Sequence, residues 1–148
     1  MKRTLIFISL PMFLVIGVTI LSACSNSKPI TGADRDAVLA YSEPETDRIL
    51  QAYNENDYAS FSKSFDAAML KGIDEKGFAN LESTLMPKIG KYISRTVNSV
   101  SYLGNYVQVA YRAKYELDDP VTVRVVFNQD VAHSIAGLWF DSAKLRQK

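Results

Sequence analysis

The feature that most constrains the fold is an alternation of apolar and polar residues between residues 106 and 140. Residues 106–117 and 121–128 each place an apolar side chain at every second position, which predicts two β-strands with one apolar face each. A loop at residues 118–120 would join them as an antiparallel hairpin. The predicted register pairs Leu117 with Val121, Tyr115 with Val123, Ala113 with Val125 and Tyr111 with Phe127, which puts both apolar sets on one buried face.

A further strand is predicted at residues 135–140, and it is apolar on both faces. Simple alternation would put Ile135 and Trp139 on one face and Leu138 and Phe140 on the other. A strand of this kind is central in its sheet, or its outer face is covered. Trp139 is therefore expected to pack in the core or in an interface.

Helices are predicted ahead of the sheet. Ser42 and Glu45 have the spacing of a capping box and predict that the first firm helix begins at Ser42. Asn56 or Asp57 caps a second short helix, and Asp74 caps a third helix that is ended by Pro87 and Gly90. A first strand follows from residue 91, with a bulge at residues 98–99. The order of these elements predicts an α+β fold in which N-terminal helices pack on a curved four-stranded antiparallel sheet.

The first 23 residues have the composition of a signal peptide. Lys2 and Arg3 precede an apolar segment at residues 5–21, and small residues follow. Leu21, Ser22, Ala23 and Cys24 resemble the lipobox of bacterial lipoproteins. That resemblance implies cleavage between Ala23 and Cys24, lipid attachment (palmitate among the acyl chains) at Cys24, and anchoring on the extracytoplasmic face of the cell membrane. The alternative is an uncleaved transmembrane anchor.

These features divide the chain into a signal peptide at residues 1–23, a flexible tether at residues 24–41 and one domain at residues 42–148. Loss of Lys2 and Arg3 with the signal peptide changes the formal net charge from +1 to −1. A near-neutral chain lacks the basic surface that nucleic acid requires. Cys24 is the only cysteine and His133 the only histidine, so neither a disulfide nor a histidine-based metal site is expected, and no cofactor is predicted.

Few residues in the domain suggest catalysis. His133 lies in a predicted turn between strands, with Asp130 nearby in the sequence, and is expected to be a solvated loop histidine, since a general acid or base needs an orienting carboxylate or carbonyl and a pocket around it. Tyr111 and Tyr115 face the predicted core and could supply hydroxyl groups. The acids considered as proton acceptors lie off the apolar faces or at helix caps: Asp47, Asp57, Asp66 and Glu82.

Three segments resemble domain of unknown function 3887, in the nuclear transport factor 2-like or cystatin-like superfamily. They are NENDYASFSKSF at residues 54–65, LMPKIGKY at residues 85–92 and GLWFDS at residues 137–142. The resemblance covers roughly residues 43–146 and implies a cone of helices and curved sheet. It carries no catalytic residues. Within such a cone the candidate pocket residues are Tyr53, Tyr111, Tyr115 and Phe127.

The function expected from the sequence is non-catalytic binding by a lipid-anchored lipoprotein. The ligand would be a small amphipathic molecule inside the cone or a protein partner on the sheet. One alternative is a small isomerase or dehydratase-like enzyme that uses the cone pocket. Another is a structural envelope module whose polar sheet face (Gln108, Arg112, Lys114, Glu116 and Arg124) forms a homodimer. The fold alone does not choose between them.

Overall fold

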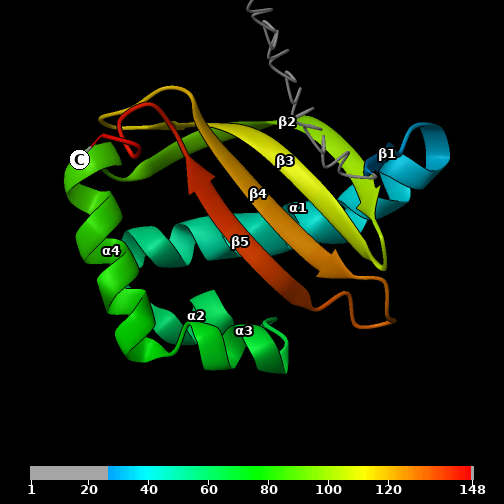
Figure 1. The fold of residues 1–148 in the computed structure, drawn as a ribbon, viewed down its shortest axis with the longest axis horizontal. Helices are drawn as coiled ribbons and strands as arrows, with labels where there is room; N and C mark the ends of the chain where they lie inside the picture. The colour runs from blue at the N-terminus through cyan, green and yellow to red at the C-terminus, as the bar shows by residue number, and fades with distance from the viewer. Residues whose placement is uncertain (1–26, 148) are drawn as a thin grey trace, which may run out of the picture.

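The computed structural model describes residues 27–147, in which helices precede an open antiparallel sheet (Figure 1). The elements, in chain order, are β1 (Ser27–Pro29), α1 (Gly32–Glu55), α2 (Tyr58–Ser62), α3 (Ala67–Gly72), α4 (Glu75–Ile89), β2 (Tyr92–Leu103), β3 (Tyr106–Tyr115), β4 (Val121–Asn128) and β5 (Ile135–Asp141). The predicted α+β class is confirmed.

The sheet has five strands in the order β1-β2-β3-β4-β5, so the prediction of four strands is wrong. The additional strand is β1, in which Lys28 pairs with Tyr102 at the edge of β2. Its three residues are exposed and lack any apolar alternation, and its pairing rests on backbone hydrogen bonds. Just after β1, the Ile30 amide donates to the Val100 carbonyl at 2.9 Å, and the Ile30 side chain is buried.

Helix α1 begins at Gly32 rather than at the predicted Ser42, so residues 32–41 of the expected tether are helical. Ser42 is fully buried in the middle of this helix, and Pro44 lies inside it, so neither belongs to a helix start. Burial of Val38 on the first turns extends the helix. Packing against the core outweighs the capping signal that the local sequence carries.

The caps predicted for the shorter helices are confirmed. The carboxylates of Asp57 and Asp74 accept hydrogen bonds from the amides of Ser60 and Gly77, at 3.1 and 2.8 Å. Helix α4 nevertheless continues through Pro87 to Ile89 and ends at Gly90, whose φ is +77°. A proline near the end of a helix removes one amide donor without ending the helix.

The predicted register between β3 and β4 is wrong, although the predicted faces are right. Tyr111 pairs with Val123 and Ala113 with Val121. The displacement is an even number of residues, so each side chain keeps its face. The two residues that follow β3 bond outside the hairpin: the amides of residues 116 and 117 donate to the carbonyls of Lys91 and Ile89, both at 2.9 Å. Those contacts with the α4–β2 connection are long-range and leave no local signal.

Strand β5 is an edge strand, so the prediction of a central or covered strand is wrong. A register irregularity opposite Val126 and Phe127 interrupts the alternation. Ile135 and Leu138 therefore share the inner face, while Trp139 lies on the outer face and is 49 % exposed. The bulge predicted at residues 98–99 is confirmed by a similar irregularity between Val97 and Ser99.

Helix α1 crosses the inner face of the sheet and builds the core with it (Figure 1). Along its length Tyr41 meets Phe127 edge-to-face, with ring centroids 5.4 Å apart, and Tyr53 meets Tyr115 at 6.2 Å. Helices α2 and α4 add Phe61 and Phe78, whose centroids are 4.5 Å apart. The opposite, outer face of the sheet is left uncovered by the described helices.

Candidate functional site

The four residues predicted to line a pocket lie in the packed core. Tyr53, Tyr111 and Phe127 are 0 % exposed and Tyr115 is 1 % exposed. None of them lines the surface hollows that lie beside Pro87, Tyr41, Ala59, Trp139 and Glu82. The inner face of the sheet is thus filled by its own aromatic side chains.

The buried tyrosine hydroxyls differ in their hydrogen bonding. The Tyr53 hydroxyl donates to the Gly90 carbonyl at 3.1 Å, and the Tyr111 hydroxyl accepts from Thr46 at 3.2 Å. Burial raises the pKa of each of these two phenols to about 12. The Tyr115 hydroxyl makes no hydrogen bond within residues 27–147, and burial raises its pKa well above the ordinary value.

Arg95 is a buried charge that the sequence reasoning missed. It pairs with Ala113 on the inner face of the sheet, and its side chain is 4 % exposed. The guanidinium binds the Glu43 carboxylate at 2.8 and 2.9 Å, and Asp47 at 2.8 Å. The sequence does contain a pattern that predicts this buried arginine. The alternation through Val97 puts Arg95 on the apolar face of its strand, and Glu43 and Asp47 lie four residues apart on one helix face.

The acids considered as proton acceptors are placed apart from one another. Asp47 binds Arg95, and Asp57 and Asp66 cap α2 and α3. Burial raises the pKa of Glu82, which lines a hollow of about 410 Å³ beside Met86. The Tyr53 hydroxyl donates its hydrogen bond to the Gly90 carbonyl, so Glu82 and Tyr53 are not a hydrogen-bonded pair.

A hollow of about 300 Å³ lies where the N-terminal part of α1 meets the β4–β5 loop; we call it the His133 hollow. The hollow is lined by aromatic and aliphatic side chains with three polar groups among them: Asp34, Ala37, Val38, Tyr41, Tyr102, Val107, Gln129 and His133. This mixture suits a small molecule that has an apolar body and polar substituents.

His133 forms one wall of this hollow, and its expected solvated environment is wrong. The imidazole stacks on the Tyr41 ring, with centroids 3.8 Å apart and planes 5° from parallel. Its backbone has φ +46°, a conformation that is rare for a residue other than glycine. The Nδ1 atom is buried and makes no hydrogen bond with any described residue. The ring is held by stacking and lacks the carboxylate that orients a general base.

The base of the His133 loop is fixed by a small polar network. The Asn128 side-chain amide donates to the Asp66 carboxylate at 3.1 Å and to the Ser134 hydroxyl at 3.0 Å. The Asp66 amide donates to the Ile135 carbonyl at 2.9 Å. Because Asp66 also caps α3, the helix and the loop hold each other in place. The β4–β5 loop, which carries His133, is therefore held in place by these hydrogen bonds.

The family comparison matches residues 46–138 to the model described as Protein of unknown function (DUF3887). The chain belongs to the DUF3887 family. No curated protein matches it. The region that matches DUF3887 contains Arg95, Tyr111 and His133 but not Tyr41 or Trp139, so of the stacked pair at the His133 hollow only His133 lies in the matched region.

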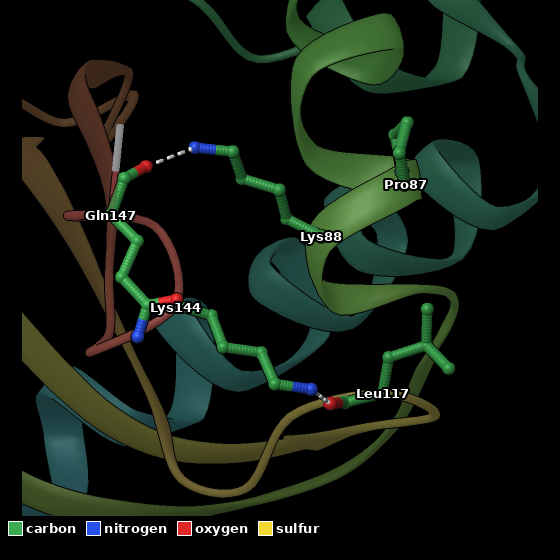
Figure 2. Close-up of a pocket in the computed structure, with 5 residues that line it drawn as sticks. All are labelled: Pro87, Lys88, Leu117, Lys144 and Gln147. Carbon is green, nitrogen blue, oxygen red and sulfur yellow. Dashed lines mark hydrogen bonds between the residues drawn. The ribbon is translucent and has the colours of Figure 1, made fainter.

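A second hollow of the DUF3887 chain lies at the opposite end of α1 and is shown in Figure 2. It has a volume of about 410 Å³ and is lined by Pro87, Lys88, Leu117, Lys144 and Gln147. The ammonium groups of both lysines already donate hydrogen bonds within the chain. Lys88 donates to the Gln147 carbonyl at 2.8 Å, and Lys144 donates to the Leu117 carbonyl. These bonds fasten the C-terminal segment to α4 and to the β3–β4 loop, which indicates a structural role.

The predicted cleavage and lipid-attachment residues, Ala23 and Cys24, lie outside the described residues, so the lipobox remains a prediction. Within residues 27–147 no helix is long and apolar enough to cross a membrane. In the same range no three residues of the His, Cys, Asp or Glu type gather in a group that could hold a metal ion.

Proposed function

We propose that this DUF3887 protein is an extracytoplasmic, lipid-anchored lipoprotein that binds a small amphipathic ligand without catalysing a reaction. In this proposal the fold is a nuclear transport factor 2-like cone, and the ligand occupies the His133 hollow at its mouth. The observation that carries the proposal is the stacked pair of Tyr41 and His133, which walls a hollow next to an interior already filled.

The lining of the His133 hollow supports a ligand of mixed polarity. Tyr41, Tyr102 and Val107 offer an apolar surface, and a bound molecule that covers them removes that surface from water. Asp34 and Gln129 stand at the same hollow and offer hydrogen-bond partners to a polar substituent. The buried Nδ1 of His133 would gain a hydrogen bond from a suitably placed donor or acceptor.

A non-catalytic role is favoured over the enzyme alternative by the placement of the ionisable groups. Proton transfer needs an acid or base that is oriented by a partner and that reaches the substrate. Glu82 has a raised pKa but lines a different hollow from His133. No described carboxylate hydrogen-bonds the His133 ring. We therefore place the enzyme alternative second.

Native mass spectrometry of a fragment beginning at Ser27, purified gently from its own host, tests the binding. We expect a monomer that carries a reproducible additional mass. His133→Asn should lose that mass, because asparagine tolerates the left-handed backbone but removes the stacked wall. Lys76→Gln on α4 is the control. A bare monomer for the unmodified chain would contradict ligand binding, and a bare dimer would favour the homodimer alternative.

The lipid anchor is tested separately by growth of the host with an alkyne-bearing palmitate. The unmodified full-length chain should incorporate the label and should be found with the membranes. Cys24→Ser should abolish the label, because a hydroxyl is a far weaker nucleophile than a thiolate. Label on the Cys24→Ser chain would show that the acyl group is carried elsewhere.

A further inference from the structure

The outer face of the sheet carries a separate hollow, which we call the Trp139 hollow. It measures about 340 Å³ and is lined by Ser27, Leu103, Gln108, Arg124 and Trp139. These residues come one from each of the five strands, and all the described helices lie on the opposite side of the sheet (Figure 1). The volume is within the range of small-molecule sites, about 300–1,000 Å³.

The Trp139 indole is held flat on the sheet by Gly137. An ideal Cβ placed on Gly137 would lie 2.2 and 2.3 Å from two atoms of the Trp139 ring, so only glycine leaves room for the ring in this position. Next to Gly137 in register is Val126, which is 4 % exposed although it belongs to the outer face. The ring remains 49 % exposed and thus presents an open aromatic surface.

Three cations lie on the outer face, and none has a partner among residues 27–147. Arg112, Lys114 and Arg124 are exposed and take part in none of the ion pairs or side-chain hydrogen bonds of the described chain. Their cross-strand neighbours are uncharged: Ser94, Thr96, Ala110, Thr122 and Trp139.

The acids near this face are already engaged. The Asp141 carboxylate binds Arg146 at 2.6 Å, and Glu116 accepts a hydrogen bond from the Lys91 amide at 3.0 Å. The Glu116 carboxylate keeps its negative charge, because an amide donor does not neutralise it, but the three unpaired cations outnumber it, so the stripe is predominantly cationic in the structure. Unpaired arginines favour carboxylate or phosphate groups, which they bind with two parallel hydrogen bonds.

A row of hydroxyl groups on β2 runs beside the cations of β3 and β4. Ser94 pairs with Lys114, Thr96 with Arg112, Ser99 with Ala110 and Ser101 with Gln108, so four hydroxyl side chains share the outer face. Three of them are exposed, and Ser101 is buried. Hydroxyl groups both donate and accept hydrogen bonds, which matches the hydroxyl groups of a sugar. An exposed indole offers a flat apolar surface on which the C–H face of a sugar ring can stack.

We infer that the outer face binds an acidic glycan, with a sugar ring stacked on Trp139 and its carboxylate or phosphate group on Arg124. Arg112 and Lys114 extend the site for the next acidic units of the chain. Nucleic acid is a poorer fit, because three cations on a near-neutral protein give little of the phosphate neutralisation on which such binding depends. An acidic peptide would use the cations but would leave the row of hydroxyl groups and the indole without matching chemistry.

Trp139 is the only tryptophan in the chain, so its fluorescence reports on this site alone. The full-length protein in mild detergent is titrated at low ionic strength with an oligogalacturonate, a phosphorylated maltooligosaccharide and an uncharged maltooligosaccharide of equal length. We expect a saturable change of emission with at least one acidic sugar and at least tenfold weaker binding of the uncharged one. The tighter of the two acidic sugars identifies the acidic group as carboxylate or phosphate.

Arg124→Gln should weaken binding of the preferred sugar about tenfold, because one charge-assisted hydrogen-bond pair is lost. Lys76→Gln removes one exposed positive charge from α4 and should leave the affinity unchanged. Equal effects of the two substitutions would overturn the assignment, as would an unchanged emission with both acidic sugars. If polyglutamate bound as tightly as the acidic sugar, the inference of a glycan ligand would be overturned in favour of an acidic protein partner.

Discussion

The guanidinium carbon of Arg95 lies 4.4 Å from the centroid of the Tyr111 ring. A positive charge over the face of an aromatic ring is favourable, and this pair is buried at the centre of the inner face of the sheet. Glu43 and Asp47 hold the same guanidinium from α1. The cluster ties the helix that carries Tyr41 to the strand that carries Arg95, so it fixes α1 against β2.

Replacement of Glu43 by glutamine should destabilise the fold, because the buried guanidinium of Arg95 loses the negatively charged carboxylate whose two oxygens accept its hydrogen bonds. Asp47 remains, and Glu43 is 38 % exposed, so we expect a loss of about 1–3 kcal/mol rather than the full cost of an unpaired buried charge. Urea unfolding measures it. Glu55→Gln, on an exposed position of the same helix, is the matched control. Equal midpoints for the two variants would show that the Arg95 pair adds no stability.

Tyr115 and Tyr53 should respond in opposite ways to replacement by phenylalanine. Tyr115→Phe removes a buried hydroxyl without a hydrogen-bond partner and should be neutral or stabilise the fold by up to about 1 kcal/mol. Tyr53→Phe removes the donor to the Gly90 carbonyl and should cost about 1 kcal/mol. Thermal unfolding of both variants checks the prediction. A clear loss for Tyr115→Phe would mean that its hydroxyl is bonded in solution.

Stability should fall at alkaline pH, because the pKa of Tyr53 and of Tyr111 is raised from 10.0 to about 12 in the folded chain. Below pH 10 these phenols are protonated in both states, and their effect on stability is constant. Between pH 10 and 12 the unfolded chain loses protons that the folded chain keeps, so the free energy of unfolding decreases. Urea midpoints from pH 8 to 12 measure the decrease, and absorbance at 295 nm follows phenol ionisation. A flat profile across that window would contradict the raised pKa values.

Gly137→Ala should displace the Trp139 ring, because the added Cβ would overlap two of its atoms. The ring lies at the end of a side chain and can swing into water, so the expected result is a shift of the emission maximum to longer wavelength with a modest loss of stability. Gly72→Ala is the control, since an added Cβ there meets no atom within 4 Å. An unchanged emission spectrum for Gly137→Ala would show that the ring does not rest on the glycine.

Local patterns predicted the elements that local interactions form. The caps of Asp57 and Asp74 need only an amide three residues away, and the structure confirms both. The alternation in β3 and β4 depends only on the geometry of an extended chain, so the faces of Tyr111 and Val123 were predictable even though their pairing was not. Arg95 was predictable in principle, since the same alternation assigns it to the apolar face.

The sequence by itself determined the class of fold, the order of helices before strands and which side chains of β3 and β4 face the core, because these follow from periodicity and from contacts between near neighbours. Tertiary structure alone decided where α1 begins, the register of β3 against β4 and the meeting of Tyr41 with His133. Each of these rests on contacts between residues far apart in the chain. The free energy of such contacts depends on the whole packed arrangement, and no short stretch of sequence records it.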